Sequence, residues 1–250
     1  MGRSALRPTS SGTKCSLASR CRMSRPMVAD KRERPDASWS FAQRHAAALF
    51  DLSGAVGLVT GGSRGIGRGM AFALAQAGAD VMITARNEDD LKATCAEIES
   101  VTGRRALYTV GDVSDREYLQ ATVDKCEREL GGLDILVPNA GISAGAPAED
   151  MSEADFQSVM DVNFMAVFAL CQVAHPLLKR GGRGKVLTIG SEYSIYGSKN
   201  TIGYSSSKHA ILGLTKSLAI GWAKDHIQVN CVIPGWIYTD LAGGAIDHGE

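Results

Sequence analysis

The octapeptide TGGSRGIG, residues 60–67, joins an apolar, β-rich run at 55–60 to an amphipathic stretch at 65–78. Its glycines allow a tight turn and let a phosphate approach the backbone and the start of the following helix. The spacing is G-x-x-x-G-x-G, not the commoner G-x-G-x-x-G. The segment therefore predicts a strand–turn–helix unit with a phosphate-binding turn, against the simpler alternative of a tight turn without a ligand.

The alternation of apolar runs and amphipathic stretches continues to residue 233. The predicted strands are 55–60, 80–85, 106–111, 133–138, 185–190 and 227–233, and the predicted helices are 65–78, 88–101, 115–131, 152–180 and 203–225. Such alternation predicts right-handed βαβ units and an α/β fold with a doubly wound parallel sheet between two helical layers. Ligands of such sheets bind at the carboxyl ends of the strands.

The composition is that of one ordinary globular domain of 250 residues. Lys+Arg and Asp+Glu are both 27, so no global charge favours nucleic acid. The six cysteines have no zinc spacing, and we expect reduced thiols, no metal site and a cytoplasmic location. We also expect no membrane span, because the longest apolar run, at 164–174, fits a buried helix.

The two ends of the chain differ from the regular middle. Residues 1–50 are predicted to be an N-terminal extension, disordered in its first half, and 51–250 a single domain. Residues 1–29 are rich in Arg and Ser and lack acids, so an organelle transit peptide is the alternative.

The end of the second predicted strand carries Arg86 where a NAD site would have an acidic residue for the ribose 2′-hydroxyl. A guanidinium attracts a 2′-phosphate and can bind it bidentately. Arg64, in the glycine turn, is placed to bind the same group. The two arginines predict NADP(H), while a solvated surface charge is the alternative for Arg86.

A candidate catalytic group follows the fifth strand, which ends at Ser191, with Tyr204 and Lys208 one helical turn apart on the next helix. Reducing a ketone requires a proton for the developing alkoxide, but a tyrosine with a pKa of about 10 is a poor base at neutral pH. An ammonium about 5 Å away would lower that pKa by about two units. Ser191 would donate to the carbonyl oxygen. The structural alternatives are that Ser191 is a strand cap, Tyr204 a buried aromatic side chain and Lys208 a surface cation.

Six motifs occur in an order that resembles the short-chain dehydrogenase/reductase family from residue 52 to 241. They are TGGSRGIG at 60–67, GDV at 111–113, NAG at 139–141, Ser191, YSSSK at 204–208 and PGWIYT at 234–239, with Asn163 between the third and fourth. The resemblance implies a Rossmann-type fold and an enzyme that acts on a secondary alcohol or ketone. Local sequence is similar to gluconate 5-dehydrogenase-like members, and 3-oxoacyl-carrier-protein reductases are the other close subgroup.

The resemblance also implies roles for single residues. Asp112 would hold the adenine, Asn139 the adenosine ribose region, and Asn163 a water that links Lys208 to solvent. The predicted catalytic residues are Asn163, Ser191, Tyr204 and Lys208. The predicted cofactor-binding residues are Gly61, Ser63, Arg64, Gly65, Ile66, Gly67, Arg86, Asp112, Val113, Asn139, Ala140, Gly141, Tyr204, Lys208, Pro234, Gly235, Ile237 and Thr239.

Two features depart from the family pattern. Pro138 stands where members have a first Asn, and it has no N–H to donate at the end of the fourth strand. Members also continue for several dozen residues past the motif at 234–239, so we expect the last strand and the substrate-loop region to be missing. A homo-oligomer is expected for a full-length chain.

Two other functions compete with this interpretation. Gly61-Gly62-Ser63-Arg64-Gly65 fits the G-x-S-x-G nucleophile elbow of hydrolases, but residues 1–54 provide no strand for the sheet that the elbow needs upstream. A catalytically impaired nucleotide-binding or regulatory protein is the second alternative, because of the early C-terminus. For the oxidoreductase, the substrate is open between a sugar acid, a polyol and a 3-oxoacyl thioester.

Overall fold

A computed structural model describes residues 50–239 of the chain. The predictions of an N-terminal extension and of a transit peptide fall on residues outside this range. The described part contains a six-stranded parallel sheet with the order β3-β2-β1-β4-β5-β6. The order reverses between β1 and β4, which is the position where doubly wound sheets bind their ligands.

The elements follow the predicted alternation. The strands are β1 (Val56–Thr60), β2 (Asp80–Ala85), β3 (Ala106–Val110), β4 (Ile135–Val137), β5 (Lys185–Ile189) and β6 (Gln228–Val232). The α-helices are α1 (Gly65–Gln76), α2 (Glu88–Thr102), α3 (Arg116–Lys125), α4 (Glu153–Met160), α5 (Ala166–Arg180) and α6 (Ile202–Trp222). Short π-helical turns, Cys126–Leu130 and Asp161–Met165, extend α3 and join α4 to α5.

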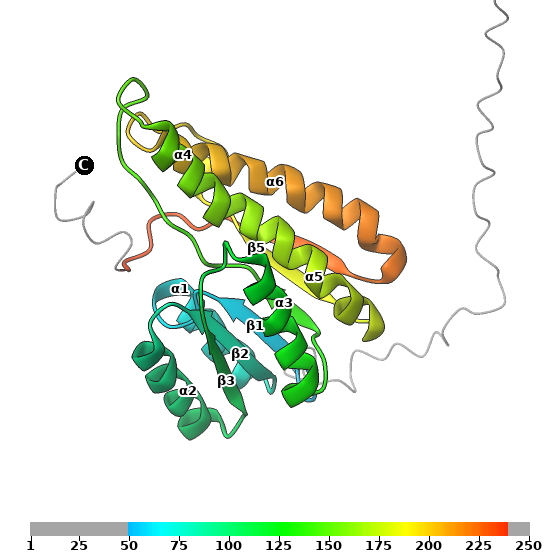
Figure 1. Cartoon of the computed structure of the whole chain (residues 1–250). Helices are drawn as coiled ribbons and strands as arrows, with labels where there is room; N and C mark the ends of the chain where they lie inside the picture. Colours follow the sequence, from blue (N-terminus) through cyan, green and yellow to red (C-terminus); the bar gives the residue numbers. More distant parts are fainter. Residues whose placement is uncertain (1–49, 240–250) are drawn as a thin grey trace, which may run out of the picture. The chain divides into compact units, whose positions relative to one another are not determined.

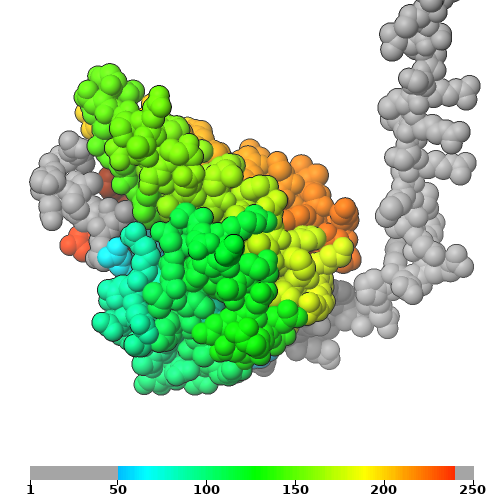
Figure 2. All heavy atoms as spheres, in the orientation of Figure 1, coloured from blue at the N-terminus to red at the C-terminus, as the bar shows by residue number. Residues whose placement is uncertain are grey.

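Helices cover both faces of the sheet, which confirms the three-layer αβα prediction (Figure 1). Neighbouring residues of a strand point to opposite faces, so Leu58 and Val59 of β1 belong to two different core clusters. Leu58 packs in the cluster that includes residues of α3, α5 and α6, and Val59 in the cluster that includes residues of α1 and α2. In the space-filling view, α3 and the α4–α5 helix cover the sheet from the viewer's side (Figure 2).

The fourth strand is shorter than predicted. It ends at Val137, and it pairs with β5 only through Ile135 and Leu136. The next residue is the buried Pro138, which has no N–H to continue the ladder. This finding agrees with the expectation that proline alters the end of the strand.

The apolar run at 164–174 lies in one long helix, Glu153–Arg180, because a π-helical turn joins α4 to α5. By length and composition alone this helix could cross a membrane, a test that the core helix of a soluble protein also passes. Leu170, Ala174 and Leu178 lie buried in the core cluster between this helix and the sheet. This packing is typical of the core helix of an α/β domain.

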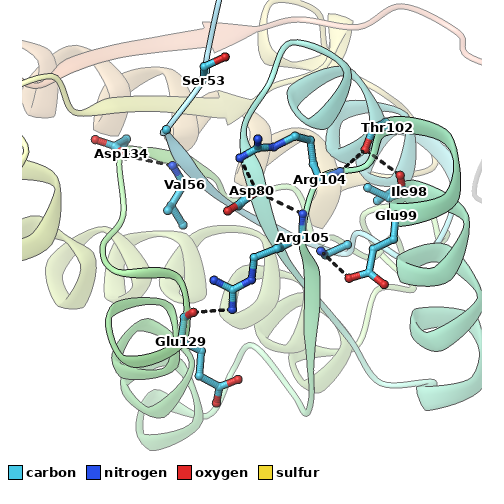
Figure 3. A network of polar contacts seen from close by, with 12 residues as sticks. Ser53, Val56, Asp80, Ile98, Glu99, Thr102, Arg104, Arg105, Glu129 and Asp134 are labelled. Atoms are coloured by element: carbon cyan, nitrogen blue, oxygen red, sulfur yellow. Dashed lines mark hydrogen bonds and ion pairs between the residues drawn. The ribbon is translucent and has the colours of Figure 1, made fainter.

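Polar contacts fasten the amino ends of the strands, at the edge opposite the carboxyl ends (Figure 3). The Asp80 carboxylate accepts the backbone N–H of Arg105 at 3.1 Å and pairs with the Arg104 guanidinium at 2.7 Å. Asp134 accepts the N–H of Val56, the first residue of β1, at 3.0 Å. These contacts satisfy backbone groups where the strands begin. The candidate site lies at the opposite edge of the sheet, at the carboxyl ends of the strands.

Candidate functional site

The glycine turn between β1 and α1 has a shape that only glycine allows at its critical positions. Gly61 and Gly65 have φ values of 65° and 54°, in the left-handed region. A Cβ at Gly67 would lie 2.2 Å from the carbonyl oxygen of Gly61. The glycine turn and the first turn of α1 are therefore packed backbone against backbone.

Helix α1 begins differently from helices α2, α3 and α4. Asn87, Asp115 and Ser152 cap α2, α3 and α4 by accepting backbone N–H groups. Among the described residues, no side chain caps α1 with a hydrogen bond, and its first turn holds no acidic residue. The uncapped amides and the positive end of the helix dipole suit an anionic phosphate, so this turn fits the pyrophosphate of a dinucleotide.

Thr60 and Asn139 connect this turn to the end of β4. The buried Thr60 hydroxyl accepts the backbone N–H groups of Asn139 and Ala140, both at 3.0 Å. The Asn139 amide donates to the carbonyl oxygens of Thr60 at 2.9 Å and Gly61 at 3.3 Å. The amide hydrogens of Asn139 therefore brace the two strand ends at the switch point. Its expected place beside the adenosine ribose stays a prediction.

The residues expected at the adenosine end lie after β2 and β3. Arg86 is exposed and close enough to Asp112 to help lower the pKa of that carboxyl. The larger causes of the low pKa are the backbone N–H and hydroxyl of Ser114, which donate to Asp112 at 2.8 and 2.7 Å. A guanidinium and a carboxylate therefore stand together at this end of the site, with Arg64 exposed in the glycine turn.

Ser191, Tyr204 and Lys208 converge as predicted. The Lys208 nitrogen lies 5.5 Å from the centre of the Tyr204 ring, and it donates to the carbonyl oxygen of Ile189 at 2.9 Å. The Ser191 hydroxyl interacts with the Tyr204 phenol. All three side chains lie at the carboxyl end of β5 and on the first turns of α6.

Burial shifts the pKa values of both titrating groups. It raises the pKa of the Tyr204 phenol, although the Ser191 hydroxyl acts in the opposite direction. It lowers the pKa of the Lys208 ammonium to about 8. Burial of the phenol thus acts against the expected lowering of the Tyr204 pKa by Lys208, and that expectation stays a prediction.

Asn163 lies in the π-helical turn between α4 and α5, and its side chain is fully occupied. It accepts the N–H of Ile142 at 2.8 Å and donates to the Ile142 carbonyl at 2.9 Å and to the Ser207 hydroxyl at 3.1 Å. It therefore ties the loop after β4 to α6. The expected role of Asn163 in positioning a water that links Lys208 to solvent stays a prediction.

The segment after β6 returns to the glycine turn. The side chain of Thr239 would contact a Cβ at Gly65 at 3.4 Å, so the two motifs lie side by side. Pro234 accepts the N–H of Glu192 at 3.0 Å, which connects the same segment to the residue after Ser191. Gly235 and Ile237 between them are exposed. The expected nicotinamide-binding segment thus lies between the glycine turn and the catalytic group.

From the sequence, no role was assigned to two residues that make hydrogen bonds at this site, Thr60 and Ser194. Thr60 was part of the first motif but received no role. The Ser194 hydroxyl accepts the N–H of Ser191 at 3.1 Å and donates to the Lys208 carbonyl at 2.8 Å. Ser191 and Ser194 form a capping box around a 3₁₀ turn, η5 (Glu192–Ser194). Their three-residue spacing is a sequence signal that could have identified this brace.

Comparison with known proteins agrees with this geometry. The family model for short chain dehydrogenases matches residues 55–248. A chloroplastic tropinone reductase homolog of Arabidopsis thaliana is 40% identical over 80% of this chain, and the chain spans 62% of that relative's length. A 2-dehydro-3-deoxy-D-gluconate 5-dehydrogenase of Dickeya dadantii is 40% identical over 76% of this chain and 75% of its own.

Among solved structures, one described as an NAD(P)-dependent gluconate 5-dehydrogenase from Beutenbergia cavernae, with NADP bound at low occupancy, superposes with a TM-score of 0.74. It is 36% identical, and the match covers 80% of this chain and 79% of that one. The family model spans most of the described domain, and the fold, the glycine turn and the Ser–Tyr–Lys group all lie within it. The chain therefore belongs to the short-chain dehydrogenase/reductase family of oxidoreductases.

Proposed function

We propose that this oxidoreductase uses NADP(H) to interconvert a secondary alcohol and a ketone, with Tyr204 as the general acid and base. The observation that carries the proposal is the group at the carboxyl end of β5. There the Tyr204 phenol meets the Ser191 hydroxyl while the Lys208 ammonium lies 5.5 Å from the ring centre. This convergence also argues against the alternative of a binding protein without catalysis.

Each side chain has a step in the proton transfer. In oxidation, the Tyr204 phenolate takes the proton of the substrate hydroxyl, and in reduction the phenol returns it to the carbonyl oxygen. Ser191 donates a hydrogen bond to that oxygen where negative charge develops. The Lys208 ammonium, 5.5 Å from the centre of the Tyr204 ring, favours the phenolate by electrostatic attraction. NADP(H), when bound, supplies or accepts the hydride.

The choice of NADP(H) over NAD(H) rests on Arg64 and Arg86. Both are exposed beside the site, and no acidic residue stands at the end of β2 where NAD enzymes hold the 2′-hydroxyl. The uncapped start of α1 would hold the pyrophosphate, and Asp112 the adenine. The bound NADP of the Beutenbergia cavernae protein supports this choice.

The cofactor proposal is tested by fluorescence titration of the purified chain with NADPH and with NADH. We expect tighter binding of NADPH, and an Arg86→Asp variant that binds NADPH at least about tenfold more weakly through like-charge repulsion. Arg128→Asp, on the π-helical turn after α3, is the matched control and leaves NADPH binding unchanged. Equal affinity of the Arg86→Asp variant and the wild type for NADPH would overturn the role of this arginine.

The catalytic proposal is tested by replacing the phenol alone. Tyr204→Phe is expected to lower turnover by about 10²–10⁴-fold, the usual contribution of a general acid or base, while NADPH still binds. Tyr108→Phe, in strand β3, is the control. Turnover that survives in Tyr204→Phe at the wild-type rate refutes the assignment.

The substrate class follows from the relatives only in outline. The Dickeya dadantii relative is named for a sugar-acid dehydrogenase. A sugar acid, a polyol and a 3-oxoacyl thioester all present the secondary alcohol or ketone that the Ser191 and Tyr204 hydroxyls can engage.

A further inference from the structure

Tyr193 stands on the short 3₁₀ turn η5, two residues after Ser191, and its ring contacts the ring of Tyr204. The two ring centres are 6.3 Å apart and the ring planes are at 90°, which is the edge-to-face geometry that aromatic pairs prefer. Both residues are half-buried. A contact between side chains therefore places Tyr193 directly against the predicted acid and base.

Hydrogen bonds hold the turn that carries this ring. The backbone N–H of Tyr193 donates to the Ser191 hydroxyl oxygen at 3.2 Å, which uses an acceptor site of that oxygen and leaves its O–H to donate. The Ser194 hydroxyl donates to the Lys208 carbonyl at 2.8 Å, one helical turn after Tyr204. The turn is thus bonded to Ser191 on one side and to α6 on the other.

The Tyr204 ring has neighbours from two different elements. The Lys208 nitrogen, from α6 itself, lies 5.5 Å from the ring centre, and the Tyr193 ring approaches from η5. A side chain can change rotamer unless its neighbours restrict it. Proton transfer requires the phenol oxygen within hydrogen-bond reach of the substrate oxygen, so a neighbour that restricts this ring also serves the reaction.

We propose that Tyr193 is a positioning residue for the proton transfer, whose ring holds the Tyr204 ring in one orientation at the carboxyl end of β5. The proposal rests on the function proposed above. The ring of Tyr193 carries the role and its hydroxyl does not, because the contact joins the two rings. Phenylalanine at this position should therefore keep the role, and an aliphatic side chain should lose it.

Three variants of the full chain test the proposal. Tyr193→Leu removes the ring, and Tyr193→Phe keeps the ring without its hydroxyl. Tyr196→Leu is the matched control, because it makes the same substitution three residues later at a tyrosine that is 66% exposed. All three variants keep the charged neighbours of the phenol, Glu192 and Lys208.

The first measurement is an NMR titration of the Tyr204 phenol in protein labelled with ¹³C in the tyrosine rings, and it needs no substrate. The signal of Tyr204 is identified by its absence in Tyr204→Phe. Burial is the largest cause of the raised pKa of this phenol, and the Tyr193 ring covers part of it. We expect the pKa to fall most in Tyr193→Leu, less in Tyr193→Phe, and not at all in Tyr196→Leu.

The second measurement is the oxidation of sorbitol and of gluconate with NADP+. Tyr193→Leu should lower kcat by about 3–10-fold, the factor that corresponds to one edge-to-face contact, while KM stays unchanged because the contact is with Tyr204 and not with the substrate. Tyr193→Phe should restore kcat, and Tyr196→Leu should match the wild type.

An unchanged Tyr204 pKa in Tyr193→Leu overturns the positioning role, and so does an unchanged kcat with either probe that the wild type oxidises. If the wild type oxidises neither probe, the NMR titration decides alone. The proposed function fails separately, through wild-type turnover in Tyr204→Phe.

Discussion

Replacing Thr60 by valine tests how the glycine turn is joined to the end of β4. The hydroxyl of this residue, which is 2% exposed, accepts two backbone N–H groups at 3.0 Å, from Asn139 and Ala140. Valine has the same shape without the acceptor, so both N–H groups lose their partner. At about 1–3 kcal/mol for each of the two unsatisfied donors, we expect the free energy of unfolding to fall by about 2–6 kcal/mol.

The chain offers a matched control on the neighbouring strand. Thr84 pairs with Thr60 in the register of β1 and β2, is 1% exposed, and its hydroxyl has no hydrogen-bond partner among the described residues. Thr84→Val should therefore raise the free energy of unfolding by about 1 kcal/mol, because it removes a buried hydroxyl that is unpaired. The two identical substitutions are predicted to have opposite signs.

Thermal and urea unfolding of the two variants measure this difference. For a domain of this size, the loss in Thr60→Val corresponds to a fall in Tm of roughly 4–24 °C. NADPH affinity should also fall in Thr60→Val and stay unchanged in Thr84→Val, because only the first loosens the strand ends beneath the pyrophosphate. Equal changes in unfolding free energy for both variants would refute the bracing role of the Thr60 hydroxyl.

Three further predictions follow from the same geometry. Gly67→Ala should abolish NADPH binding, because its Cβ would lie 2.2 Å from the Gly61 carbonyl, whereas Gly69→Ala, with nothing within 4 Å, should retain binding and gain about 0.5–1 kcal/mol of stability. Burial lowers the pKa of Lys208 to about 8, because the charged form is destabilised in the folded state. As the pH rises from 7 to 9, the folded protein loses this proton before the unfolded chain does. The free energy of unfolding in urea should therefore rise by about 1 kcal/mol for the wild type relative to Lys208→Met. If the difference in unfolding free energy between the wild type and Lys208→Met does not change with pH, the Lys208 ammonium is not desolvated. The kcat/KM for ketone reduction should fall as pH rises through about 8, where Lys208 loses its charge, and a constant profile would contradict its role.

The order of strands and helices was predictable because each element carries a local signal. Runs of β-branched and apolar residues alternate with amphipathic stretches, and the observed bounds differ from the predicted ones by a few residues. The largest difference, at β4, has a cause that was visible in the sequence, since Pro138 cannot extend a ladder. The π-helical turns were not predictable, because they depend on how α3 and the α4–α5 helix pack over the sheet.

Sequence spacing was enough to select Ser191, Tyr204 and Lys208, because residues four apart on a helix share a face and a strand end lies at the ligand edge. It was not enough for their pKa values, which reflect desolvation by residues distant in the sequence. The bracing contacts of Thr60 and Asn139 likewise appeared only after folding. Hydrogen bonds and electrostatic fields depend on distances through space, and residues about 80 positions apart along the chain meet at 3.0 Å across the sheet only when it forms.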